Sequence, residues 1–76
     1  MINQETPVKP MELRHTLREV ERLVDIGMVR AARFTLTVSL QKSEEAEARG
    51  EAWGPSLVRE LRAALQDFER EHPLPP

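Results

Sequence analysis

The chain has 76 residues, a formal net charge of −2 and no cysteine. A domain this small buries too little surface to be comfortably stable, and it usually needs disulfides, a structural metal or a partner. Disulfides are excluded, and the two histidines, His15 and His72, lie at opposite ends of the sequence, which leaves association as the remedy.

The charge balance and the lack of long apolar runs argue against a nucleic-acid-binding protein and against a membrane or secreted protein. Eleven Lys and Arg residues stand against thirteen Asp and Glu residues, which argues against a nucleic-acid binder that relies on a broad positive field. No apolar run approaches the ~18 residues needed to span a bilayer, and the N-terminus lacks the basic and apolar regions of a signal peptide. We therefore expect a cytoplasmic protein with no membrane partner.

The first half of the chain begins with an arm and continues into an amphipathic helix. Residues 1–9 have no periodicity, and Pro7 and Pro10 prevent a helix from running through them, so they are predicted to form a flexible arm. A helix is predicted over 11–26, and Gly27 suits a left-handed cap that would send the next segment back along the first. The apolar stripe of this helix consists of Leu13, Leu17, Val20 and Val24.

The stretch 33–40 has two interpretations. As a helix it is apolar on two faces, with Leu36 and Leu40 on one and Phe34 and Val38 on the opposite one. As a strand it alternates cleanly between apolar and polar side chains in residue types that favour strands. The polar face of that strand would carry Arg33, Thr35, Thr37 and Ser39.

The second half of the chain contains a segment rich in Glu and Ala and then a second amphipathic helix. Residues 41–50 favour a helix by propensity, yet they offer almost nothing apolar larger than alanine, so nothing in them is expected to anchor a core. The break Trp-Gly-Pro at 53–55 precedes a helix predicted over 55–71, and residues 73–76 are predicted as a tail. The stripe of the last helix consists of Leu57, Val58, Leu61, Ala64, Leu65 and Phe68.

No pattern of catalytic or ligand-binding residues emerges. His15 and Glu19 share a helical face, but two ligands from one chain fall short of a metal site. The serines have no nearby histidine or glycine-rich elbow, the clustered glutamates lie in a solvated run, and no phosphate-binding glycine loop occurs. We therefore expect neither an enzyme nor a cofactor, and no small-molecule substrate is evident.

Residues 33–68 resemble the ribbon-helix-helix family of DNA-binding dimers. The similar features are the alternating stretch from Arg33 to Thr37, a short helix from Ser43, a turn at Gly54 and the apolar stripe that follows it. The resemblance implies that two strands pair across a dimer and that alternate strand residues enter the major groove, with amides near Ser56 meeting a phosphate. The DNA-binding positions would be Arg33, Thr35, Thr37 and Ser56.

The sequence therefore supports two alternative folds, and we favour the helical one. It is an all-α protein of three helices over about 11–26, 28–49 and 55–71, the first two forming an antiparallel hairpin, within a single domain at 10–72. It would act as a non-enzymatic regulator (an adaptor, inhibitor or chaperone-like protein) that forms a homodimer and binds another protein through an apolar helical surface. The expected interface residues are Phe34, Val38, Met28 and Trp53. The alternative is a DNA-binding ribbon-helix-helix repressor with an added N-terminal helix.

Overall fold

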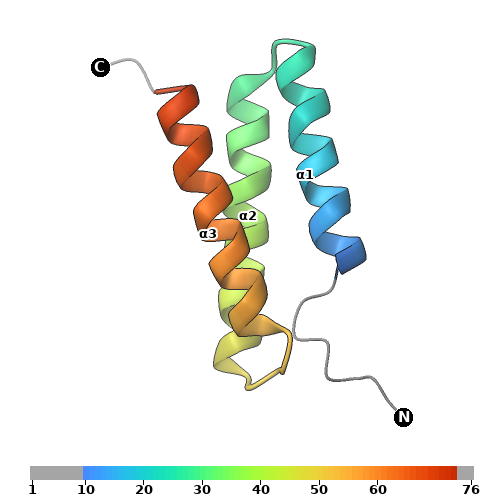
Figure 1. The fold of residues 1–76 in the computed structure, drawn as a ribbon, viewed down its shortest axis with the longest axis vertical. Coiled ribbons are helices and arrows are strands. Elements are labelled where there is room, and N and C mark those ends of the chain that lie inside the picture. Colours follow the sequence, from blue (N-terminus) through green and yellow to red (C-terminus); the bar gives the residue numbers. More distant parts are fainter. Residues whose placement is uncertain (1–9, 74–76) are drawn as a thin grey trace.

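Three α-helices make up the part of the chain that the computed structural model describes, residues 10–73. They are α1 (Pro10–Asp25), α2 (Val29–Ala48) and α3 (Gly54–Glu71) (Figure 1). Each boundary lies within one residue of the predicted one, so the predicted all-α fold is confirmed. The predicted arm at 1–9 and most of the predicted tail lie outside the described residues.

Helices α1 and α2 end with the same pattern of backbone hydrogen bonds. After α1, the amide of Gly27 donates to the carbonyl of Val24 (3.0 Å) and that of Met28 to Leu23 (2.8 Å). After α2, Gly50 and the following residue repeat this pattern. The two glycines have φ of +84° and +81°, which side chains with a Cβ rarely adopt, and this pairing is the Schellman motif. Figure 1 shows the chain reversing direction at each of these turns.

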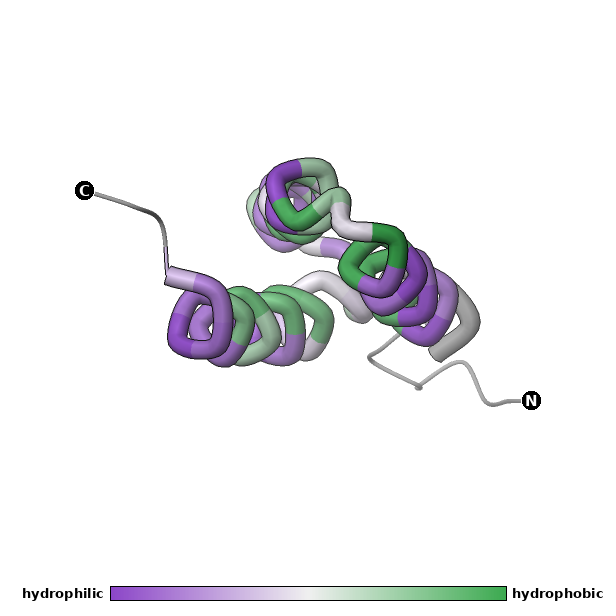
Figure 2. Tube along the Cα trace, turned by 90° about the horizontal axis from the view of Figure 1, so that it is seen from above, coloured by the Kyte–Doolittle hydropathy of each residue, from purple (hydrophilic) through white to green (hydrophobic). Residues whose placement is uncertain are grey.

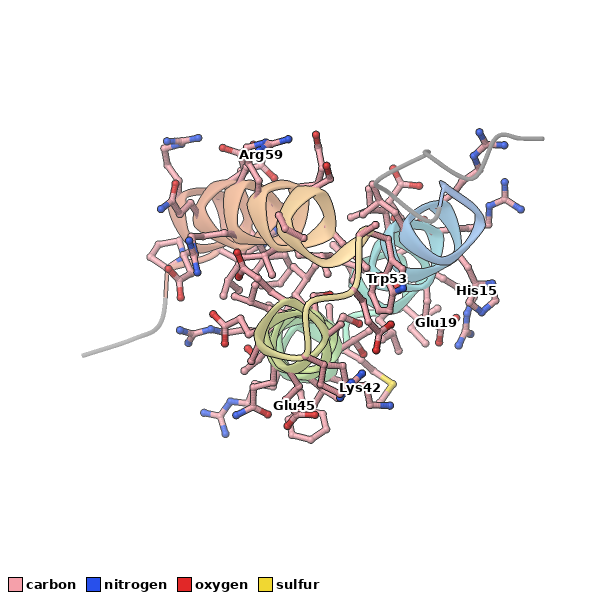
Figure 3. The ribbon with its side chains drawn as sticks, turned by 90° about the horizontal axis from the view of Figure 1, so that it is seen from below. His15, Glu19, Lys42, Glu45, Trp53 and Arg59 are labelled. Atoms are coloured by element: carbon pink, nitrogen blue, oxygen red, sulfur yellow. The ribbon has the colours of Figure 1, made fainter. Side chains whose placement is uncertain are left out.

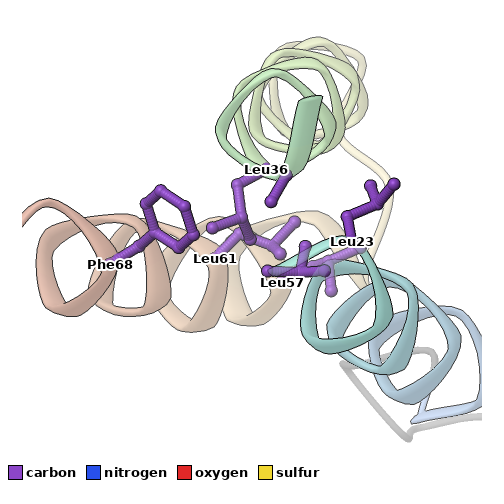
Figure 4. Packing of buried hydrophobic residues seen from close by; sticks show 7 residues of the cluster. Leu23, Leu36, Leu57, Leu61 and Phe68 are labelled. Carbon is purple, nitrogen blue, oxygen red and sulfur yellow. The ribbon is translucent and has the colours of Figure 1, made fainter. Parts of the chain in front are cut away.

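The hydrophobic core lies where α2 faces its two neighbours. Helix α2 packs against both α1 and α3, whereas α1 and α3 approach each other only marginally. Seen along the helices, α2 lies at the apex with the other two on either side of it (Figure 2). Leu36 and Leu61 are the most deeply buried leucines, 1% and 2% exposed. The other members of the buried cluster are Val20, Leu23, Ala32, Leu57 and Phe68 (Figure 4).

The strand that the ribbon-helix-helix resemblance implies is not formed, because residues 33–40 lie within α2. Their hydroxyl groups find partners in the helix itself: Thr35 donates to the carbonyl of Ala31 and Thr37 to that of Arg33, both at 3.0 Å. Such bonds to the carbonyl four residues back satisfy the hydroxyl groups within the helix, although they do not offset the poor helix propensity of threonine. Residues 33–40 fit both the period of a strand and that of a helix, and the packing of α2 against its neighbours selects the helix.

The C-terminal half of α2 contributes to the packing more than its composition predicts. Ala46 is fully buried and Ser43 is nearly so. The Ser43 hydroxyl donates to the carbonyl of Ser39 at 2.9 Å, which satisfies it in the interior. Small side chains let α3 approach this end of α2 closely, and Gly54 is buried at the contact. The prediction that nothing at 41–50 anchors the fold is therefore wrong.

Candidate functional site

The outward face of α2 exposes a large aromatic side chain. Phe34 is 68% exposed and lies on the opposite side of the helix from the buried Ala32 and Leu36. Val38, one turn further on, is only half-buried beside it. The second apolar face that the sequence predicts for α2 is present, and no described residue of the same chain covers Phe34.

The other two predicted interface residues lie at the ends of the bundle. Met28, at the turn between α1 and α2, is 49% exposed, and its neighbour Ile26 is 57% exposed. Trp53 is half-buried in the connection before α3, where it lies beside α1 and the end of α2 (Figure 3). The structure therefore brings Phe34 and Val38 together and leaves Met28 and Trp53 apart. Ile26 is not among the expected interface residues, because it lies at the end of the predicted helix over 11–26 and off its apolar stripe.

Charged side chains flank Phe34 along the outward face of α2. Arg30 precedes it by four residues and Glu45 follows it by eleven, so all three share one side of the helix. Figure 3 shows Glu45 projecting away from α1 and α3. Within residues 13–73 neither Arg30 nor Glu45 forms an ion pair. One end of this face is basic and the other acidic.

Two of the five ion pairs among the described residues join α2 to α3. Arg33 Nη2 lies 2.5 Å from Glu69 Oε2, and Arg62 Nη2 lies 3.2 Å from Glu44 Oε2. Both pairs are partly exposed, so each contributes about 1 kcal/mol at most. They also show that the helices meet along one side of α2, away from Phe34.

The residues expected to contact DNA do not form one free surface. Arg33 is engaged by α3, Thr35 and Thr37 point to different sides of α2, and Ser56 is buried in the first turn of α3. The Ser56 hydroxyl accepts a hydrogen bond from Arg59 Nη2 at 3.5 Å. An arrangement of this kind gives no set of parallel side chains that could enter a major groove.

On the outer surface of α1, Glu19 is paired with an arginine rather than with His15. Arg22 Nη2 lies 2.7 Å from Glu19 Oε2, and Arg22 Nε donates to Oε1 at 3.2 Å. These hydrogen bonds hold the pKa of Glu19 below its ordinary value of 4.5; slight desolvation opposes them, and the charges of Arg22 and His15 add to the lowering. Of these causes, the charge of His15 contributes least to the lowering.

The Glu19–Arg22 pair predicts a small pH dependence of stability. Because the pKa of Glu19 is lower in the folded chain than in the unfolded chain, the pair stabilises the fold above about pH 4.5. That contribution is lost as the pH falls through the lowered pKa. We expect Glu19→Gln to melt slightly below the parent at about pH 7 and level with it at about pH 2. Glu21→Gln, an exposed change on the same helix, is the control, and a difference for Glu19→Gln that persists at low pH would contradict the assignment.

The described residues contain neither a membrane-spanning helix nor a cluster of metal ligands. No helix there is both long enough and apolar enough to cross a membrane. No group of three or more His, Cys, Asp or Glu side chains converges in the described part of the chain as a metal site would require. Comparison with protein families, curated proteins and solved structures gave no match to this chain.

Proposed function

We propose that this chain is a small non-enzymatic regulatory protein that works by binding a polypeptide through the outward face of α2, and that its first partner is a second copy of itself. The observation that carries the proposal is the 68% exposure of Phe34 at the centre of that face. An adaptor, an inhibitor or a chaperone-like protein would use such a surface. The cysteine-free composition fits the reducing cytoplasm as its location.

The need for a partner follows from the size of the core. Seven residues form the buried cluster, one of them an alanine. The chain has no cysteine for a disulfide, and its described residues offer no group of side chains that could hold a metal. Complete burial of one phenylalanine contributes about 1.5–3 kcal/mol. In a symmetric dimer both copies gain this amount, which is a large fraction of the stability of a domain this small.

The charges around Phe34 fit a second copy in an antiparallel orientation. A two-fold axis close to Val38 would place Arg30 of one copy opposite Glu45 of the second copy, and the same pair would form again on the other side of the axis. Phe34 of each copy would then lie beside Gln41 and Val38 of the other. The face is thus self-complementary in charge as well as in apolar area, which favours a homodimer over an unrelated partner.

Paired charge reversals test this arrangement. Arg30→Glu and Glu45→Arg, each alone, should weaken self-association about tenfold, because each places like charges opposite one another twice in the dimer. The double variant should restore the affinity of the parent. Phe34→Ala should raise the dissociation constant by about tenfold or more, as for a central aromatic residue of an interface. The measurement is sedimentation equilibrium over a range of protein concentrations.

The matched control is Arg59→Glu, which makes the same charge change on α3, away from the outward face of α2 (Figure 3). It should leave self-association unchanged. A parent protein that stays monomeric throughout the accessible range of concentrations would rule out the homodimer. Failure of the double variant to recover would reject the antiparallel arrangement.

A further inference from the structure

A cavity of about 720 Å³ opens at the end of the bundle where α2 passes into α3. Its walls come from the first half of α1, the second half of α2 and the start of α3. This volume lies in the range of sites that hold small molecules. The apolar part of its lining consists of Leu13, Trp53, Leu57 and Leu61.

The ionisable side chains of the lining are all basic residues. They are Arg14, His15, Arg18 and Lys42, and the described lining includes no Asp or Glu. This contrasts with a chain whose formal charge is −2. Among the described residues five other arginines form ion pairs, whereas Arg14, Arg18 and Lys42 form none. Glu19 lies nearby in Figure 3, but its carboxylate is held by Arg22.

We propose that this cavity is a binding site for a small amphipathic anion, of the class of medium-chain aliphatic carboxylates. Its hydrocarbon chain would pack against the leucines and Trp53, and its carboxylate would accept hydrogen bonds from Lys42 and the neighbouring arginines at the mouth. An inorganic anion would leave the apolar walls unused, and a neutral hydrocarbon would leave the cations without a counter-charge. The cavity opens on a different side of α2 from Phe34, the residue on which the proposed self-association depends, and Lys42 lies at the border between the two, near Glu45 (Figure 3).

Trp53 is the only tryptophan of the chain and lines the cavity, so its fluorescence reports occupancy directly. Decanoate, titrated below the concentration at which it forms micelles, should change the emission of Trp53 saturably. Decanol and decylammonium have a hydrocarbon chain of the same length but no negative charge. They should bind at least about tenfold more weakly than decanoate. Equal affinities for the three probes, or no binding of decanoate, would overturn the proposal.

Amino-acid substitutions inside and outside the cavity test whether decanoate binds there. Lys42→Glu should weaken decanoate binding about tenfold, and Arg59→Glu, outside the cavity, should not change it. Phe34→Ala should also leave binding unchanged, because Phe34 lies on the far side of α2, and this variant keeps the test independent of self-association. Unchanged binding in Lys42→Glu would overturn the assigned role of the basic mouth. Loss of binding in Phe34→Ala would overturn the assignment of the site to a single chain.

Discussion

Replacement of Leu61 by alanine is expected to lower the free energy of unfolding by about 2–5 kcal/mol, the range for a buried leucine. Leu61 is 2% exposed and lies between α2 and α3, beside Leu36 and Leu57 (Figure 4). The change removes apolar area and leaves a cavity that two helices held by short turns cannot close. In a chain this small the loss approaches the whole stability. Chemical denaturation at fixed protein concentration is the measurement.

The control for this prediction is Leu65→Ala, one turn further along α3. The chemical change is the same, but Leu65 is only partly buried. Its loss should therefore be smaller, although the sequence places the two leucines on one stripe and predicts similar effects. A loss for Leu65→Ala that equals or exceeds that for Leu61→Ala would show that the core is centred elsewhere.

Replacement of Gly54 by alanine is expected to destabilise the protein by about 1–3 kcal/mol, the range for overpacking. A Cβ at this position would lie 2.7 Å from the backbone nitrogen of Glu47, 2.8 Å from its Cα and 3.1 Å from the carbonyl carbon of Ala46. These are backbone atoms, so no change of rotamer can relieve the clash and one helix must shift. Helix propensity alone predicts the opposite sign, since alanine is favoured over glycine by about 1 kcal/mol.

Gly50→Ala provides the comparison for Gly54→Ala. A Cβ at Gly50 would meet nothing within 4 Å, but its φ is +81°. The expected loss is therefore the strain of a left-handed residue alone, about 1 kcal/mol. Thermal melts of the two variants and the parent make the test. A neutral or stabilising Gly54→Ala would mean that α3 does not approach α2 as closely as the structure shows.

The helices themselves could be predicted from the sequence because two of them carry regular apolar stripes and end at glycine or proline. The middle helix is harder to predict from the sequence. Residues 33–40 satisfy both a period of two and a period of 3.6, and only the packing of Leu36 against α3 decides between them. The face with Phe34 and Val38 follows directly once the helix is assumed. Its exposure therefore could be predicted.

Two features could not be read from the sequence. The burial of Ser43 and Ala46 depends on how closely α3 approaches α2, and that distance is set by Gly54, at a position where the sequence indicates only a break. The cavity draws its lining from three separated segments. Its basic residues lie on different helices, and no periodicity within one helix connects Arg14 with Lys42.

The marginal contact between α1 and α3 has a consequence for the motions of the protein. The backbone of α1 approaches α2 far more than α3, so we expect α1 to separate first while α2 and α3 stay packed. Such a partial opening costs less free energy than global unfolding, and amide hydrogens of α1 would exchange with solvent ahead of those at the α2–α3 contact. A molecule bound in the cavity would contact all three helices. It would therefore stabilise the packed position of α1 and slow the exchange of its amide hydrogens.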